Sequence, residues 1–325
     1  MKRLIITLLA LAAWTAAQAQ SVTFSISEGL ANGPLRQKID NNLTNLLTSF
    51  NDCFDDGSGL NLSGVFITPD AADALSMLWG NMPFHCEEPE IVERIAKTYS
   101  GYQVRNVPIE LRADDGRTDY QELVIDLEPD GTVSRVNLAL QNHLYRKVMS
   151  DGSEVTDLRC RQMILDYVEQ FRTAYNRKDI DFLENVFSDD ALIITGKVVR
   201  RKKGDRMAVL KEDTQIEYTQ QRKHEYIEKL RTRVFPNNKY IQVTFTDIKV
   251  SKHPSVDGYY GVMLRQGYKS STYSDDGYLF MLWDFRDEAH PQIHVRTWQP
   301  YWLDDKKTQK LSEDKVFNIN SFTIR

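Results

Sequence analysis

Three side chains in the second part of the sequence have types that suit proton-transfer chemistry. Asp284 interrupts an otherwise apolar, strand-like run at residues 278–283, and Tyr167 and Tyr175 lie on one predicted helix before it. A carboxylate base with hydroxyl donors for a developing oxyanion is what isomerase-type reactions need. We favour the alternative that Asp284 ends the strand beside Arg286 in water and that both tyrosines are core residues. We therefore assign no catalytic residue and keep the three as a candidate ligand pocket.

One face of the last predicted strand carries an imidazole, a guanidinium and an indole, from His294, Arg296 and Trp298. Strand alternation places these side chains opposite a smaller, mainly apolar face. That second face consists of Ile293, Val295 and Thr297. His294, Arg296 and Trp298 together suit an anionic or aromatic ligand, but Trp and Arg are also enriched at binding hot spots of protein interfaces. We predict an interface, either with the first half of the same chain as a pseudo-dimer or with a second copy.

The run His85-Cys86-Glu87 has metal-ligand chemistry, but no second cluster has the sequence spacing of a zinc site. We therefore predict no metal site. The sequence contains no G-x-x-x-x-G-K-[ST], G-x-G-x-x-G, G-x-S-x-G or H-E-x-x-H motif. Nucleotide binding and the common hydrolase mechanisms are unsupported, and we predict no cofactor.

The chain has three cysteines, which are too few for disulfides to be its main scaffold. Cys53 and Cys86 flank one predicted helical segment and could pair if their Cα atoms lie within about 7 Å. Three unpaired thiols, Cys160 included, are the equal alternative.

The first residues of the chain are typical of a secretory leader. Lys2 and Arg3 are followed by an apolar stretch at residues 4–14 and by the small-x-small pattern Ala17-Gln18-Ala19. We expect cleavage after Ala19 and a periplasmic or secreted protein. No later apolar run has the roughly 18 residues that a membrane span needs, so we expect a chain that does not span a membrane.

Charge and length limit the partners and the number of domains. Loss of Lys2 and Arg3 with the leader would change the formal net charge from -5 to -7, which argues against a nucleic-acid partner. The remaining chain, at roughly 300 residues, is long enough for two domains. A polar, turn-rich stretch at residues 149–157 is the predicted boundary, which gives domains at residues 20–150 and 151–325.

The predicted elements follow a similar order in the two halves. The first half has helices at residues 35–54 and 68–79, a third helix opened by Pro89 and closed by Gly101, a strand at 102–111, and a hairpin around Pro129-Asp130-Gly131. The second half has a long helix ending near Tyr175, a short helix capped by Asp179, a strand at 191–199, and a third helix at 226–234. Four strands follow, at residues 240–250, 259–268, 278–285 and 292–302. The run at 278–283 is almost entirely apolar and predicts a central strand.

Residues 156–302 resemble the nuclear transport factor 2-like superfamily. The resemblance rests on the long helix into AYNRKD at 174–179, then FL at 182–183 and FSDDAL at 187–192. It implies a cone-shaped α+β (cystatin-like) fold, with helices on a curved antiparallel sheet that can hold a pocket. The first half resembles this fold only in element order, which predicts tandem domains. A polar stretch at 199–222 departs from the small enzymatic members.

The resemblance implies no activity, because the superfamily includes isomerases, dehydratases, hydrolases and members that only bind or dimerise. Our leading prediction is an exported binding or assembly module without catalytic activity, whose partner is an envelope protein or a small ligand. The alternative is an isomerase, dehydratase or cyclase that uses a pocket in the second half. Whether Asp284 faces an enclosed cavity within reach of a tyrosine separates the two.

Overall fold

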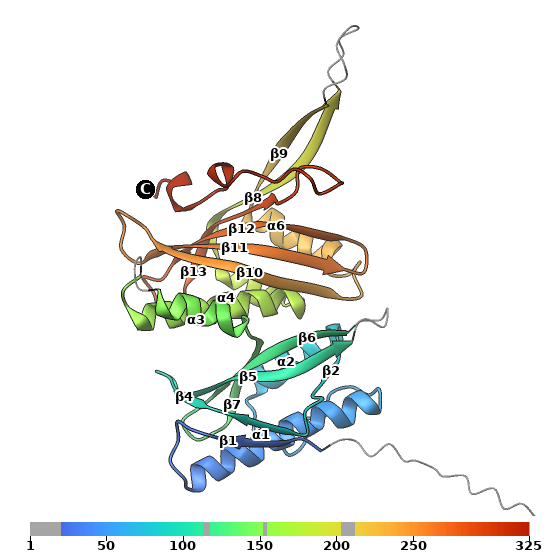
Figure 1. Ribbon diagram of the computed structural model, residues 1–325, viewed down its shortest axis with the longest axis vertical. Helices are drawn as coiled ribbons and strands as arrows, with labels where there is room; N and C mark the ends of the chain where they lie inside the picture. Colours follow the sequence, from blue (N-terminus) through green and yellow to red (C-terminus); the bar gives the residue numbers. More distant parts are fainter. Residues whose placement is uncertain (1–20, 113–117, 152–154, 203–211, 325) are drawn as a thin grey trace, which may run out of the picture.

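The computed structural model describes residues 21–112, 118–151, 155–202 and 212–324. The predicted leader, residues 1–19, lies outside these ranges. Two halves, each with helices packed on a mainly antiparallel sheet, are stacked along the longest axis of the molecule (Figure 1). The α+β fold predicted from the sequence is confirmed. No helix within the described ranges combines the length and the apolar composition that crossing a membrane requires.

Among the residues that the structure describes, the first half contains two helices and seven short or medium strands. They are β1 (Thr23–Ile26), α1 (Pro34–Asp55), α2 (Pro69–Asn81), β2 (Phe84–His85), β3 (Glu90–Glu93), β4 (Ile95–Lys97), β5 (Tyr102–Arg112), β6 (Thr118–Leu127) and β7 (Val133–Leu138). The sheet has the order β2-β5-β6-β7, with β4 also paired to β5, while β1 and β3 form a separate parallel pair. The predicted hairpin at Pro129-Asp130-Gly131 is confirmed as β6–β7.

The third helix predicted between Pro89 and Gly101 is wrong. Ile91 and Ile95 are spaced like neighbours on a helix, but they belong to the separate strands β3 and β4. Phe24 of β1 pairs with Ile91, and Val104 of β5 pairs with Ile95. The backbone partners of β3 therefore lie far away in the sequence, in β1, whereas β4 pairs with the strand that follows it; the local apolar spacing indicates neither pairing.

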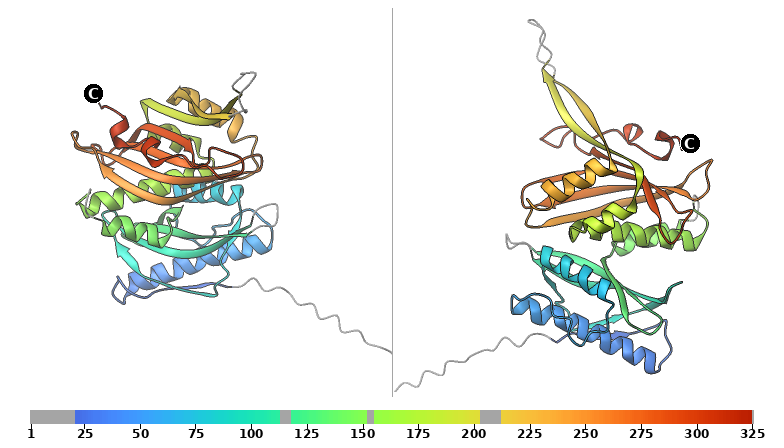
Figure 2. Two further views of the ribbon diagram at one scale, coloured as in Figure 1. Left: turned by 45° about the horizontal axis from the view of Figure 1, so that its top comes forward. Right: turned by 180° about the vertical axis from the view of Figure 1, so that it is seen from behind.

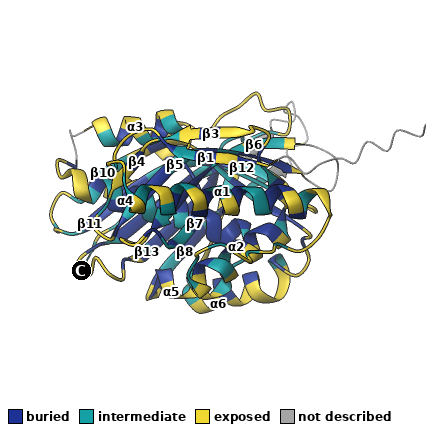
Figure 3. Ribbon diagram, turned by 90° about the horizontal axis from the view of Figure 1, so that it is seen from below, coloured by how far each residue is buried: buried dark blue, intermediate teal, exposed yellow. Residues whose placement is uncertain are grey.

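The first core forms between α1, α2 and the sheet. Helix α1 buries one side and exposes the other (Figure 3). Phe84 of β2 contacts Phe50 and Trp79 edge-on, with ring centroids 4.9 and 5.2 Å apart. Cys53 and Cys86 are buried in this core and, like Cys160, are unpaired, so the thiol alternative is the one observed.

The second half is larger. Its elements are α3 (Asn142–Ser150), α4 (Leu158–Asn176), α5 (Ile180–Val186), β8 (Phe187–Lys202), β9 (Glu212–Arg222), α6 (Lys223–Lys229), a π-helical turn (Leu230–Val234), β10 (Ile241–Lys252), β11 (Tyr259–Ser270), β12 (Ser274–Asp284), β13 (Gln292–Pro300) and two 3₁₀ turns (Glu313–Lys315 and Ile319–Ser321). The sheet order is β10-β11-β12-β13-β8-β9, and β8 runs parallel to β13.

The polar stretch at 199–222, expected as an insertion, contributes a full strand to this sheet. Strand β9 pairs with β8 from Leu192↔Arg222 to Lys202↔Glu212. The two strands form a long hairpin that projects from the rest of the molecule (Figures 1 and 2). Residues 217–220 of β9 are exposed, which explains why this strand lacks the apolar alternation of a strand packed on a core.

Strand β12 lies inside the sheet and is covered on both faces, as predicted. We call the side packed on α4, α5 and α6 the inner face and the opposite side the outer face. Met281 and Trp283 belong to the core on the inner face, and Phe280 belongs to a smaller cluster on the outer face. The C-terminal segment covers this outer cluster, with the Phe322 ring stacked on Phe280 at 5.7 Å.

Helix α4 lies between the two halves (Figure 1). It contacts β7 of the first half as well as β10 of the second. The second core begins before the predicted boundary at residue 150, because Leu140, Leu144 and Val148 pack with α4. The first core ends at Leu138.

Candidate functional site

A cavity of about 410 Å³ opens at the inner face of the second sheet. Its walls come from α4, α6 and the π-helical turn, and from strands β8, β11, β12 and β13. Five of the residues that line it are aromatic. The aromatic residues are Tyr175, Tyr226, Tyr268, Tyr273 and Trp298.

Arg296 of β13 supplies a buried positive charge to this cavity. The side chain is only 6 % exposed, and its Cζ lies 5.3 Å from the ring centroid of Tyr226. Burial disfavours the charge, but Tyr226, Tyr175 and Asp275 outweigh that effect and hold the pKa of Arg296 above its usual value. The guanidinium therefore stays charged in the wall of this cavity.

Three buried polar atoms of the cavity wall lack a hydrogen-bond partner in the part of the chain that the structure describes. They are Nε of Arg296, Nε1 of Trp298 and Oδ1 of Asp275. An unsatisfied buried polar group costs about 1–3 kcal/mol, and native proteins rarely leave several of them together. Two donors and one carboxylate oxygen around one cavity are what a polar ligand would satisfy.

Asp275 is the carboxylate of this cavity. Burial raises its pKa to about 6, although a hydrogen bond from Tyr273 and the charge of Arg296 act in the opposite direction. The hydroxyls of Tyr175 and Tyr226 lie 2.5 Å apart, and burial raises the pKa of Tyr175 well above its usual value. The cavity thus combines a carboxyl group whose pKa is raised to about 6 with the Tyr175 hydroxyl, which remains protonated.

The predicted trio of Tyr167, Tyr175 and Asp284 does not form one site. Tyr175 lines the cavity, whereas Tyr167 packs on Trp283 and donates its hydroxyl to the carbonyl of Ala289, 3.4 Å away. Asp284 lies outside the cavity beside Arg286, from which it accepts hydrogen bonds; its side chain is 12 % exposed and does not face open water as our favoured alternative expected.

The environment of Asp284 keeps it ionised. Its own burial opposes the negative charge, but hydrogen bonds from Arg286 and Tyr259 lower its pKa to about 2. Nε2 of His294 lies 3.4 Å from the same carboxylate. A carboxylate held in this way by a cation is a poor general base.

The predicted interface of His294, Arg296 and Trp298 is wrong, because these side chains do not share an outward face. A β-bulge at His294 causes the error: Trp283 pairs with Ile293, and Leu282 pairs with Val295. The extra residue in β13 shifts the alternation by one position.

After the bulge, Arg296 and Trp298 face the cavity, and both side chains are at most 8 % exposed. His294 lies instead between Asp190 and Asp284, with nitrogen–oxygen distances of 3.6 and 3.4 Å. The first half of the chain meets α4 and β10, so the pseudo-dimer contact does not use this trio either.

Sequence analysis missed Asp275 as a cavity residue. The signal was present, because counting back from Met281 in steps of two along β12 reaches Leu279, Gly277 and Asp275 on the same face. A glycine is needed at position 277, because an added Cβ would lie 2.6 Å from Cε2 of Trp298. The small residue thus lets the indole lie across the strand beside Asp275.

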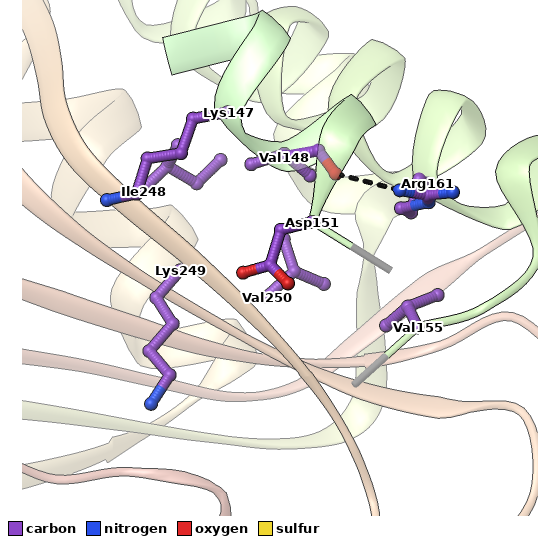
Figure 4. A pocket seen from close by; sticks show the side chains of 8 residues that line it. All are labelled: Lys147, Val148, Asp151, Val155, Arg161, Ile248, Lys249 and Val250. Carbon is purple, nitrogen blue, oxygen red and sulfur yellow. Dashed lines mark hydrogen bonds between the residues drawn. The ribbon is translucent and has the colours of Figure 1, made fainter. Parts of the chain in front are cut away.

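A second cavity, of about 160 Å³, lies between α3 and β10 (Figure 4). Arg161 points toward it and donates hydrogen bonds to the carbonyls of Val148 and Met149 at the end of α3, at 3.4 and 2.5 Å. A cation at a helix C-terminus satisfies the last carbonyls and opposes the helix dipole. This smaller cavity therefore belongs to the connection between α3 and α4.

Comparison with known proteins gives similarity in structure only. No family model matches the chain, and no curated protein matches it. A structure of Bd1075 from Bdellovibrio bacteriovorus aligns with 14 % identity over 52 % of this chain and a TM-score of 0.33; the match spans about half (47 %) of that protein.

Shorter proteins align with a single part of the chain. An NTF2-like protein from Cytophaga hutchinsonii is 15 % identical, over 43 % of this chain and 97 % of its own, with a TM-score of 0.28. A putative aromatic ring hydroxylase from Novosphingobium aromaticivorans is 18 % identical, over 44 % and 90 %, with a TM-score of 0.32. The second half of this chain has helices packed on a mainly antiparallel sheet, which is the α+β arrangement that the resemblance in the sequence implied.

Proposed function

We propose that this chain is a binding module whose second half holds a small organic ligand with an anionic group. The observation that supports the proposal is the buried guanidinium of Arg296, whose Nε lacks a partner among the described residues. It faces a cavity of about 410 Å³, which is within the size range of small-molecule sites. Tyr226, Tyr175 and Asp275 already stabilise this charge, and an anion would add a direct, charge-assisted partner for it.

The cavity wall suggests the class of ligand. A guanidinium binds a carboxylate or phosphate through parallel hydrogen bonds. Lys197 and Lys229 line the same cavity and add positive charge. The tyrosines and Trp298 offer flat surfaces for an aromatic or alicyclic body. We infer a compact acid in which a planar or cyclic body carries one carboxylate.

A pair of matched probes tests this proposal. Benzoate and benzamide have nearly the same shape, but only benzoate is charged, so titration calorimetry should show saturable binding of benzoate and weaker binding of benzamide. Arg296→Gln should weaken benzoate binding by more than about tenfold, since a charge-assisted hydrogen bond contributes roughly 1.5–3 kcal/mol. Arg286→Gln, outside the cavity, is the control. Equal affinity for both probes, or benzoate binding that survives Arg296→Gln, would contradict the proposal.

One observation favours an enzyme as the second candidate. Asp275 has the raised pKa of a general base, and the Tyr175–Tyr226 hydroxyl pair lies in the same cavity. A carboxylate base with hydroxyl donors matches the isomerase-type chemistry considered for Asp284. In deuterated water, an enzyme of this type should exchange a proton of a bound carbonyl compound for deuterium, and Asp275→Asn should abolish that exchange. A cavity that only binds its ligand should show no exchange in either protein.

We also propose that the protein acts outside the cytoplasm, in the periplasm or after secretion. The leader-like residues 1–19 support this. The alternative binding partner of this module is an envelope protein. N-terminal sequencing of the mature protein would test export, since cleavage after Ala19 leaves Gln20 first, whereas an intact Met1 would contradict it.

A further inference from the structure

One face of the β2–β5 edge in the first half brings together three metal-ligating side chains. His85 is the last residue of β2, and Glu87 follows two residues later in the segment after the strand. Glu110 of β5 is the direct cross-strand partner of His85. Cys86 points the other way, into the first core, where Asn51 donates a hydrogen bond to its carbonyl at 2.9 Å.

The geometry of this cluster suits one small cation. An imidazole nitrogen of His85 and one carboxylate oxygen each from Glu87 and Glu110 all lie within 4.8 Å of one another. Nδ1 of His85 is buried and has no hydrogen-bond partner within the described residues. The ring of Phe54 stacks on the imidazole at 4.3 Å and fixes its orientation.

The two carboxylates lie in an environment that favours a cation between them. Glu110 is only 6 % exposed. One of its carboxylate oxygens lies within 4.8 Å of a carboxylate oxygen of Glu87. The hydroxyl of Tyr120, the cross-strand neighbour of Glu110, lies 3.4 Å from Glu87. Either a proton or a metal ion would relieve the repulsion between the two carboxylates.

We propose that His85, Glu87 and Glu110 bind one divalent transition-metal ion, with Zn²⁺ as the best-fitting ion. One imidazole with two carboxylates is a mixed nitrogen and oxygen set, which Zn²⁺ accepts with three protein ligands and a water molecule. Ca²⁺ takes six to eight oxygen ligands and Mg²⁺ a near-ideal octahedron of oxygens, and three ligands with one imidazole suit neither. The charges of the ion and the two carboxylates cancel.

The proposed site differs from the expectation, made from the sequence, that the chain has no metal site. That expectation rested on the lack of a second cluster at zinc-like spacing in the sequence. Glu110 supplies the missing ligand across the sheet, through strand pairing. Because β2 is only two residues long, a metal ion here would tie a short edge strand to the centre of the first sheet.

The test measures metal uptake by the whole purified protein, prepared with a histidine-free affinity tag and stripped with a chelator. Competition with a chromogenic zinc indicator should show one Zn²⁺ bound per chain. His85→Gln and Glu110→Gln should each weaken binding by more than about tenfold, because even the loss of a supporting residue around a metal costs 10–100-fold. Glu88→Gln and His224→Gln, both at exposed positions, are the matched controls.

Thermal melting distinguishes loss of a ligand from loss of the fold. Zn²⁺ should raise the melting temperature of the wild type and of both controls but not that of Glu110→Gln. Without metal, Glu110→Gln should melt no lower than the wild type, since it removes one of two neighbouring carboxylates. The proposal is overturned if the stripped protein takes up no Zn²⁺ in proportion to its concentration, or if His85→Gln and Glu110→Gln bind it as tightly as the controls do.

Discussion

Arg105 of β5 and Glu169 of α4 form a buried ion pair between the two halves, with Nη1 of the arginine 3.1 Å from Oε2 of the glutamate. Glu169 is 1 % exposed and also accepts a hydrogen bond from the backbone N–H of Leu140, at 2.6 Å. Arg172, one turn later on α4, donates to the carbonyls of Ala139 and Val243 at 2.8 and 2.9 Å. Helix α4 thus makes buried polar contacts with both sheets and with residues 139–140, which connect β7 to α3.

Glu169→Ala should destabilise the whole chain by about 3–5 kcal/mol, because it leaves the Arg105 charge and the Leu140 N–H without their buried partner. Urea unfolding of the full chain measures the change. The matched control is Glu184→Ala, which breaks the exposed pair with Arg231 and should cost no more than about 1 kcal/mol. Similar losses in both variants would mean that the buried pair does not hold the halves together.

The position of α3 changes the expected behaviour of an isolated second half. A fragment starting at residue 154 lacks Leu140, Leu144 and Val148, all buried in the second core. Loss of buried leucines commonly costs 2–5 kcal/mol each. A fragment of residues 139–325 should therefore unfold cooperatively and at a higher temperature than one of residues 154–325. Equal melting temperatures in calorimetry would place the boundary near residue 150, as the sequence alone predicted.

Trp298→Ala should now lower stability and leave association unchanged. The side chain is 8 % exposed and lies against Gly277 on the inner face, so truncation opens a void that typically costs about 3–5 kcal/mol. Calorimetry measures the stability, and analytical ultracentrifugation measures the mass. A variant that melts like the wild type but dissociates from a partner would restore the interface prediction.

Elements with local signals could be predicted from the sequence. Thr68 accepts a hydrogen bond from the N–H of Ala71, and Pro69 occupies the first helical position, as the Thr-Pro pair indicated. Alternating apolar residues likewise located β6 and β7. Each of these signals depends on neighbours within a few residues, which the sequence contains directly.

The site could be predicted only in part, because its geometry depends on pairing between distant segments. Nothing near His294 indicates the bulge that turns Arg296 and Trp298 inward, since the bulge is defined against β12. The pairing of His85 with Glu110 likewise joins two strands and has no local sign in the sequence. Residue types singled out several of these side chains, but the face of the sheet and the neighbouring side chains became known only from the strand register.

The raised pKa of Asp275 predicts a pH dependence for both stability and ligand binding. Its pKa of about 6 in the folded protein exceeds the usual 3.8, so between these values the native state binds more protons than the unfolded state. Stability therefore falls as pH rises through this window. Asp166 on α4, whose burial raises its pKa to about 7, contributes a similar trend. The part of this pH dependence that comes from Asp275 is the part that Asp275→Asn should remove.

The unfolding free energy of the wild type should thus fall relative to that of Asp275→Asn between about pH 4 and pH 7. An anionic ligand on Arg296 should bind more tightly below about pH 6, where Asp275 is neutral and no longer repels it. Calorimetric titration of benzoate into both proteins across this range measures the effect, and the variant should show little change. Parallel pH profiles for the two proteins would mean that Asp275 ionises normally and does not face the ligand.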